Sequence, residues 1–146
     1  MTYGKTAKDI ANQLVACFKR GNKCLIFGNG GSLADASHFA AEFHSIGPVI
    51  ALNDPAKITS IGNDYHFNNI FSLQIVTTGK EGDIAIGLSS SGESENVNLA
   101  LKCAKVYGMK VIDFPRQGNT TQEVQEFQYG LLHQIYLEVK ELYKNT

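Results

Sequence analysis

Short apolar runs alternate along the chain with longer segments whose apolar residues recur every three or four positions. The runs predict strands over 23–27, 48–52, 83–88 and 109–112, and the first two are typical of strands buried on both faces. The segments with helical spacing are 6–20, 32–44, 68–74, 95–107 and 121–143. Strands that alternate with helices predict parallel βαβ units. We therefore expect an α/β fold with a doubly wound parallel sheet flanked by helices, in three α/β/α layers.

The size and composition of the chain fit one folded domain over residues 1–146. Of these residues 43% are hydrophobic, enough for one core without disulfides. Three widely spaced cysteines predict buried thiols in a reducing compartment. No segment resembles a signal peptide or a membrane helix of about 20 apolar residues, so we expect a cytoplasmic protein. The net charge of −1 and scattered cations predict no binding of nucleic acid or of a membrane surface.

A glycine-rich loop follows the first predicted strand. Gly28, Asn29, Gly30, Gly31 and Ser32 lie between that strand and an alanine-rich helix. Glycines let a ligand touch the backbone, and a helix N-terminus offers unpaired N–H groups and the positive end of its dipole. The loop therefore predicts a site for an anion such as a phosphate.

A second loop of unusual composition follows the third predicted strand. Ser89, Ser90, Ser91 and Ser94 supply hydroxyls beside a predicted helix N-terminus, and Gly92 permits a tight turn. Such groups suit a phosphate monoester in a site without lysine. By itself, an ordinary serine-rich turn explains the loop equally well. Because ligands of doubly wound sheets bind beyond the carboxyl ends of the strands, the two loops together favour the phosphate site.

His38 and Glu42 are four residues apart, on one face of the predicted helix 32–44. They fit two metal ligands, or an acid and a base that act on one substrate. A solvated helical pair is the commoner origin of this spacing, by about ten to one. The nearby anion site shifts the balance toward a functional pair.

Other polar residues are ambiguous from spacing alone. Gln125 and His133 are eight residues apart on the last predicted helix, so about 80° of rotation separates them and both can face one cleft. A surface glutamine and a core histidine are the simpler interpretation. Asn63 and Asp64 can cap a helix or bind sugar hydroxyls. Thr120 or Thr121, with Glu123, fits the start of the last helix.

Four separated motifs resemble those of a known family. They are GNGGS with DASHFAAE, then IGND, then SSSGESENV, and finally TQEVQEFQYGLLHQ. Through them the chain, from about residue 6 to its end, resembles the phosphoheptose isomerases, a branch of the sugar isomerase (SIS) family. Four motifs in the right order are far more specific than one glycine loop.

The resemblance implies a SIS fold and a homotetramer whose active sites lie between subunits. Members convert sedoheptulose 7-phosphate into D-glycero-D-manno-heptose 7-phosphate, the first step toward bacterial heptoses for lipopolysaccharide or capsule. The implied cofactor is one zinc ion per subunit, held by His38, Glu42, Gln125 and His133. The implied substrate contacts are Asn29, Gly30, Gly31, Ser32, Glu42, Asn63, Asp64, Ser89, Ser90, Ser91, Ser94 and Gln125.

Aldose–ketose isomerisation needs the residue types that these positions supply. A proton moves between C1 and C2 through an enediol, which requires a base at carbon, a proton shuttle between the oxygens and a cation for the oxyanion. We assign Glu42 as the carbon base, His133 as the acid/base on oxygen and zinc as a Lewis acid. If Glu42 both binds the zinc and accepts the proton from carbon, it must alternate between these two roles.

Two stretches are shorter than the family pattern. The stretch 43–49 lacks several loop residues, and after Ile112 the chain skips a helix and an edge strand. Loss of an internal helix and strand conflicts with keeping Gln125 and His133 in place. We therefore expect internal residues to be absent from the sequence at both stretches, with a break in the chain there.

Two other functions share this fold. A non-catalytic adaptor that binds the replication initiator would lack the His/Glu combination on the helix. A sugar-phosphate sensor would need the serine loop but not Glu42. Because His38, Glu42, Gln125 and His133 are all present, we favour the isomerase.

Overall fold

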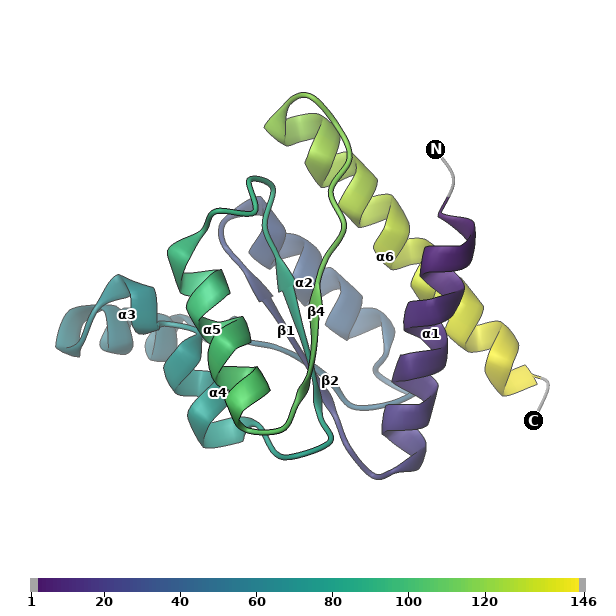
Figure 1. Ribbon diagram of the computed structural model, residues 1–146, viewed down its shortest axis with the longest axis horizontal. Helices are drawn as coiled ribbons and strands as arrows, with labels where there is room; N and C mark the ends of the chain where they lie inside the picture. Colours follow the sequence, from purple (N-terminus) through teal and green to yellow (C-terminus); the bar gives the residue numbers. More distant parts are fainter. Residues whose placement is uncertain (1–2, 145–146) are drawn as a thin grey trace.

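A computed structural model describes residues 3–144 as a sheet with helices on both faces (Figure 1). In chain order the elements are α1 (Gly4–Lys19), β1 (Cys24–Gly28), α2 (Gly31–Glu42), β2 (Val49–Ala51), α3 (Pro55–Asp64), the 3-10 turn η1 (Phe67–Asn69), α4 (Ser72–Thr78), β3 (Ile84–Leu88), α5 (Glu95–Val106), β4 (Lys110–Asp113) and α6 (Thr121–Lys144).

The four strands are parallel and lie in the order β2-β1-β3-β4, which confirms the predicted fold class. The chain passes from β1 outward to β2 and then returns to the other side of β1 with β3. In the β1–β3 pair Cys24 lies opposite Ile84, and Gly28 lies opposite Leu88. The carboxyl ends of the two strands are thus level. The loops that follow them begin side by side, at the reversal point where sheets of this type bind ligands.

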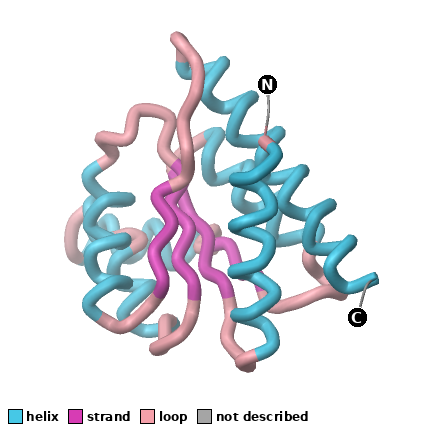
Figure 2. Tube along the Cα trace, turned by 45° about the vertical axis from the view of Figure 1, so that its right-hand side comes forward, coloured by secondary structure: helices cyan, strands magenta, loops and turns pink. Residues whose placement is uncertain are grey.

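Two hydrophobic cores hold the helices to the sheet. Cys24 and Ile26 of β1 face one core, which α1, α2 and α6 complete. Leu25 and Phe27 alternate with them and face the other core, with α4 and α5. Figure 2 shows the strands between these two helical layers. Every residue of β1 and β3 is buried, which is why both strands are continuous apolar runs in the sequence.

The strand β2 differs from the prediction of a strand buried on both faces over 48–52. Only Val49–Ala51 are in strand conformation, and 41% of the Ile50 side chain is exposed. β2 lies at the edge of the sheet, where β1 is its one neighbouring strand. An apolar run indicates a strand, but its composition does not say how many neighbours cover it.

The helices between β2 and β3 also differ from the apolar pattern. The helix α3 is not predicted by that pattern, because it buries none of its residues. Polar signals start it: the Asp54 carboxylate accepts a hydrogen bond from the Ala56 N–H at 2.9 Å, and Pro55 occupies the first helical position. The helix predicted over 68–74 is divided into η1 and the later α4.

The start of α6 is capped as the sequence suggests. The Glu123 N–H donates to Thr120 Oγ1 at 3.1 Å, and Glu123 Oε2 accepts from the Asn119 N–H at 2.6 Å. This reciprocal arrangement satisfies the Glu123 N–H, which the helix leaves unpaired, and the Asn119 N–H just before the cap. Thr120, and not Thr121, is therefore the capping residue.

The structure runs through both stretches that are shorter than the family pattern with local hydrogen bonds and strand pairing, and the absence of internal residues from the sequence there stays a prediction. After α2 a turn closes with a hydrogen bond from the Ile46 N–H to the Phe43 carbonyl at 2.9 Å. At the second stretch β4 pairs with β3 through Ile112 and Asp113. The sheet then ends at β4, and the segment 114–120 leads directly into α6.

The cysteines agree with the prediction of buried thiols. Cys17 and Cys24 are buried, and burial raises the pKa of both thiols, that of Cys24 well above its ordinary value. Cys103 is partly buried and also free.

Across residues 3–144, no helix has the length and apolar character needed to cross a membrane.

A buried carboxylate joins two loops, those before β1 and β3, at the end of the sheet opposite the glycine and serine loops. Asp83, 1% exposed, accepts hydrogen bonds from Lys23 Nζ at 2.6 Å, Asn22 Nδ2 at 2.8 Å, and the N–H groups of Lys80 at 2.8 Å and Lys23 at 3.1 Å. Burial alone would raise the pKa of Asp83, but these hydrogen bonds outweigh burial and lower it. The charged carboxylate therefore stabilises the fold.

We expect Asp83→Asn to lower the free energy of unfolding by about 2–4 kcal/mol at pH 7, because it leaves Lys23 without its partner. The pKa of Asp83 is lower in the folded state than the unfolded value near 3.9. The contribution of Asp83 to the free energy of unfolding is thus complete above the unfolded pKa and is lost as the pH falls through the folded pKa. Urea unfolding between pH 3 and pH 7 tests this. Asp9→Asn, at an exposed position of α1, is the matched control.

Candidate active site

Two histidines and a glutamate meet between α2 and α6. His38 Nε2 lies 3.5 Å from Glu42 Oε1, and His133 Nε2 lies 3.8 Å from the same oxygen. The two Nε2 atoms are 3.5 Å apart. His38 and Glu42 come from successive turns of α2, as their spacing predicts, and His133 comes from α6. The structure therefore unites three of the four residues predicted as metal ligands.

The chemistry of this group fits a divalent cation. Glu42 Oε1 is buried and accepts no hydrogen bond from the described part of the chain. A buried carboxylate oxygen without a donor is costly, and a cation removes that cost. Two imidazoles and one carboxylate, all with ligand atoms within 4.8 Å of one another, form a donor set typical of catalytic zinc. Such a set leaves coordination positions open for a substrate.

Two further residues beside this group are not identified by the sequence analysis. Tyr129 packs its ring against His133, with centroids 4.3 Å apart, and against His38 at 5.5 Å. Asp35 lies one turn before His38, and burial raises the pKa of its carboxyl, while the charges of His38 and His133 act in the opposite direction. The signal was present in the spacing: Tyr129 is four residues before His133, and Asp35 three before His38.

Gln125 lies at the glycine loop. A Cβ placed on Gly31 would be 2.7 Å from Gln125 Nε2, so the amide packs on the first turn of α2. Along α6, Gln125 is about 12 Å from His133, two turns away. Its amide is therefore directed at the glycine loop, whereas the two histidines and Glu42 lie further along both helices.

The glycine loop is tied to the start of α5. Asn29 and Asn96 exchange two amide hydrogen bonds, of 2.8 and 2.9 Å, and Asn96 is almost fully buried. Gly30 has a φ of +54°, a conformation that favours glycine, and Ser32 is buried with its N–H bonded to the Asn29 carbonyl. Asn96, which the sequence analysis does not single out, thus holds the loop in place.

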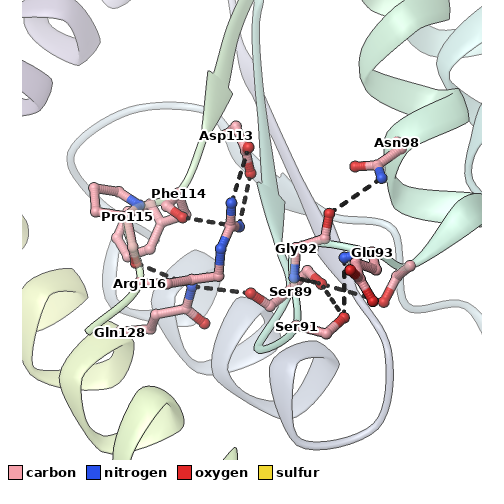
Figure 3. Close-up of polar contacts among 11 residues, drawn as sticks. Ser89, Ser91, Gly92, Glu93, Asn98, Asp113, Phe114, Pro115, Arg116 and Gln128 are labelled. Carbon is pink, nitrogen blue, oxygen red and sulfur yellow. Dashed lines mark hydrogen bonds and ion pairs between the residues drawn. The ribbon is translucent and has the colours of Figure 1, made fainter. Parts of the chain in front are cut away.

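The serine loop forms a tight turn, shown in Figure 3. Ser89 Oγ lies 3.4 Å from Ser91 Oγ and 3.2 Å from Ser94 Oγ, and it accepts a hydrogen bond from the Gly92 N–H at 3.0 Å. The Glu93 N–H donates to Ser91 Oγ at 3.0 Å. Three hydroxyls and backbone N–H groups thus gather before α5. Ser90 follows in the same turn and is partly exposed.

One helix contacts both loops and the histidines. Gln128 of α6 is buried, and its Nε2 donates to the carbonyls of Ser89 at 3.3 Å and Pro115 at 3.1 Å. On the same helix Gln125 contacts Gly31, and His133 reaches Glu42. α6 therefore aligns the serine turn, the glycine loop and the His/Glu group.

Asn63 and Asp64 lie elsewhere. Both are exposed at the end of α3, where the Asn63 amide donates to the Asp64 carboxylate at 3.0 Å. In Figure 1, α3 lies on the far side of α5 from α2 and α6. Within one chain, the structure does not bring these two residues to the His/Glu group.

Comparison with known proteins identifies the family. The model of the SIS domain matches residues 5–114, which include β1, β3 and both loops. The chain belongs to the SIS-domain family. It is 46% identical to the phosphoheptose isomerase of Clostridium acetobutylicum over 120 residues, 77% of this chain and 61% of that protein. It is 37% identical to the phosphoheptose isomerase of Fusobacterium nucleatum over 154 residues, 90% of this chain and 79% of that protein.

Solved structures of the family superimpose closely on this SIS-domain chain. Phosphoheptose isomerase GmhA from Neisseria gonorrhoeae matches 94% of this chain and 86% of its own, with a TM-score of 0.89 and 32% identity. The match to a phosphoheptose isomerase from Francisella tularensis has the same TM-score and coverage at 30% identity. The chain spans only 61% and 57% of the length of the relatives from C. acetobutylicum and Thermodesulfovibrio yellowstonii.

Zinc affinity tests the metal-binding group. We expect His38→Ala and His133→Ala each to weaken Zn²⁺ binding by at least about tenfold, because each removes one of three candidate ligands. Competition with a chromophoric chelator measures the affinity. His66→Ala is the control, because His66 lies before η1, outside the group. Equal affinity in all three variants would contradict a metal site at these residues.

Proposed function

We propose that the chain is an aldose–ketose isomerase that converts sedoheptulose 7-phosphate into D-glycero-D-manno-heptose 7-phosphate, a precursor of bacterial heptoses. The assembled group of His38, Glu42 and His133 is the observation that carries this proposal. It combines a carboxylate and imidazoles, the groups that an enediol reaction requires. The family relationship to phosphoheptose isomerases supports the same reaction.

In this proposal Glu42 takes the proton from carbon. Its Oε1 faces the two imidazoles, so we assign the other carboxylate oxygen as the base that carries the proton between C1 and C2. His133 lies beside Glu42 on the opposite helix, and we assign it to move the proton between the two sugar oxygens. Tyr129 packs against the His133 ring and limits its rotation.

Zinc fits the same group, as the orphaned Glu42 oxygen indicates. We propose that His38, Glu42 and His133 hold it, one ion per chain. When bound, zinc supplies a Lewis acid that stabilises negative charge on a substrate oxygen. Gln125, directed at the glycine loop, is assigned to the substrate rather than to the ion.

The phosphate end of the substrate is assigned to the serine turn. Ser89, Ser91 and Ser94 gather their hydroxyls there, and Ser90 adjoins them. The helix α5 begins directly after Ser94. A helix N-terminus and hydroxyls suit a phosphate group. We assign the glycine loop, with Asn29, Gly30, Gly31 and Ser32, to the part of the sugar between the phosphate and the reacting carbons C1 and C2. Asn63 and Asp64 remain predicted contacts that one chain alone does not supply.

The isomerase predicts a specific isotope result. In D2O with sedoheptulose 7-phosphate and zinc, we expect NMR to show the aldose with deuterium at C2, because the enediol exchanges its proton with solvent. Glu42→Gln lowers this rate by about 10²–10⁴-fold, since it removes the base. Glu126→Gln, an exposed position on α6, is the matched control and keeps the rate. A chelator tests the requirement for metal.

Other outcomes would identify the alternatives. Binding of the sugar phosphate without isomerisation, equally in Glu42→Gln, would indicate a sensor. Absence of both binding and turnover would point to the non-catalytic adaptor of the replication initiator. Neither alternative accounts for a glutamate whose buried oxygen is aimed at two histidines.

We also propose that the chain assembles as a homotetramer with sites between subunits. Leu137 lies one turn beyond His133 on α6, and 49% of its side chain is exposed. We place Leu137 in the surface that another copy covers. Light scattering should give four times the 15.9 kDa mass of one chain. Leu137→Lys should shift the mass toward smaller species, and a monomeric, active wild type would contradict the assembly.

A further inference from the structure

An arginine lies on the serine turn. Arg116 belongs to the segment that follows β4, and its side chain reaches Gly92 (Figure 3). A Cβ placed on Gly92 would be 2.8 Å from Arg116 Cζ and 2.9 Å from both Nε and Nη2. Because the three distances are nearly equal, the guanidinium lies flat against the turn. A side chain at position 92 would occupy the same space, and its φ of +74° also favours glycine.

Asp113 fixes the orientation of this guanidinium. Arg116 Nη1 donates to Asp113 Oδ1 at 3.0 Å, and Nη2 donates to Oδ2 at 3.2 Å. Two parallel hydrogen bonds to one carboxylate hold the planar group more firmly than a single contact does. These bonds raise the pKa of Arg116 further, so it is always charged. Asp113 is the last residue of β4, so the arginine is braced on the sheet.

Arg116 retains donors for a ligand. Besides Asp113, its Nη1 contacts the Phe114 carbonyl at 3.4 Å. An arginine has five N–H donors. In the described part of the chain, the Nε–H and the second N–H of Nη2 have no acceptor. Nε and Nη2 are the atoms that lie on Gly92, within the turn that gathers the hydroxyls of Ser89, Ser91 and Ser94.

We propose that Arg116 binds the phosphate group of the substrate, an inference that rests on the proposed function and extends it. The serine turn offers hydroxyls, N–H groups and a helix N-terminus, but none of these carries a full positive charge. A phosphate monoester carries about −1.5 to −2 charges at pH 7. The guanidinium supplies a fixed cation with two N–H donors at the edge of the turn. Asp113 and Gly92 are positioning residues for it.

A purely structural role is the alternative. The Arg116–Asp113 pair would then brace the turn, and the charge on the ligand would not matter. Binding of a phosphorylated ligand and of its unphosphorylated analogue separates the two roles.

The experiment compares Arg116→Gln and Arg116→Lys with a matched control, Arg20→Gln. Arg20 also braces a loop, since its Nη2 donates to the Gly82 carbonyl at 2.7 Å, but that loop precedes β3. We expect Arg116→Gln to raise the KM for sedoheptulose 7-phosphate and the Kd for inorganic phosphate by about 10–100-fold, with kcat nearly unchanged. Arg116→Lys keeps the charge, so its KM and Kd should lie between those of the wild type and Arg116→Gln. Arg20→Gln matches the wild type in both constants.

Two further measurements complete the test. Calorimetry with unphosphorylated sedoheptulose should give the same affinity for the wild type and Arg116→Gln. Asp113→Asn keeps the arginine charged but loosens it, so it should weaken phosphate binding less than Arg116→Gln does. Thermal melts confirm that each variant is folded, and if Arg116→Gln is not, Arg116→Lys and Asp113→Asn carry the comparison.

The outcomes separate this inference from the proposed function. An active enzyme whose phosphate affinity and KM are unchanged in Arg116→Gln overturns the inference alone. Loss of kcat with unchanged phosphate affinity also overturns it and indicates a structural brace. Phosphate binding that depends on Arg116 in a wild type without isomerase activity supports the inference and overturns the proposed function. A wild type that binds neither phosphate nor the sugar phosphate overturns both.

Discussion

The parallel pairing of β1 with β3 is the constraint on which the rest of the structure depends. It aligns Gly28 with Leu88, so that two loops distant in the sequence start level with each other. The backbones approach so closely that a Cβ on Gly28 would lie 2.6 Å from the Leu88 carbonyl oxygen and 2.7 Å from Ser32 Cβ. Only glycine fits there. The pairing, the sharp entry into α2 and the position of the serine turn are therefore set together.

The helix α6 is the second determinant of the site. It is 24 residues long and packs on the face of the sheet that carries α1 and α2. Its buried stripe, which includes Leu131, Leu132 and Ile135, fixes its rotation. That rotation in turn directs Gln125, Gln128 and His133 at three different parts of the site. A change in core packing would thus move the chemistry.

The sequence predicted best those features in which local spacing and tertiary structure agree. β1 and β3 are buried on both faces and are continuous apolar runs, and His38 and Glu42 share a helical face because they are four residues apart. β2 was predicted too long and too buried, since an apolar run does not reveal an edge position. The helix α3 has no buried residue, so polar start signals alone mark it.

The contacts of Arg116 and Asn96 could not be derived from spacing. Arg116 meets Gly92 across 24 positions of sequence, and Asn96 pairs with Asn29 across 67. Both contacts depend on how strands and loops align in space. Conversely, Asn63 and Asp64 belong to a recognisable motif, yet they lie at the exposed end of α3. A motif identifies residues that recur together in sequence without fixing whether they meet in one folded chain.

Because the chain passes from β4 directly to α6, the outer edge of β4 has no neighbouring strand in the described part of the chain. Such an edge is a template on which a strand from another molecule can add. Lys110 and Asp113, exposed at the two ends of this four-residue strand, oppose that addition, because pairing would desolvate both charges. Asp113 thus orients an arginine on one side and, through the same charge, protects the sheet against aggregation on the other.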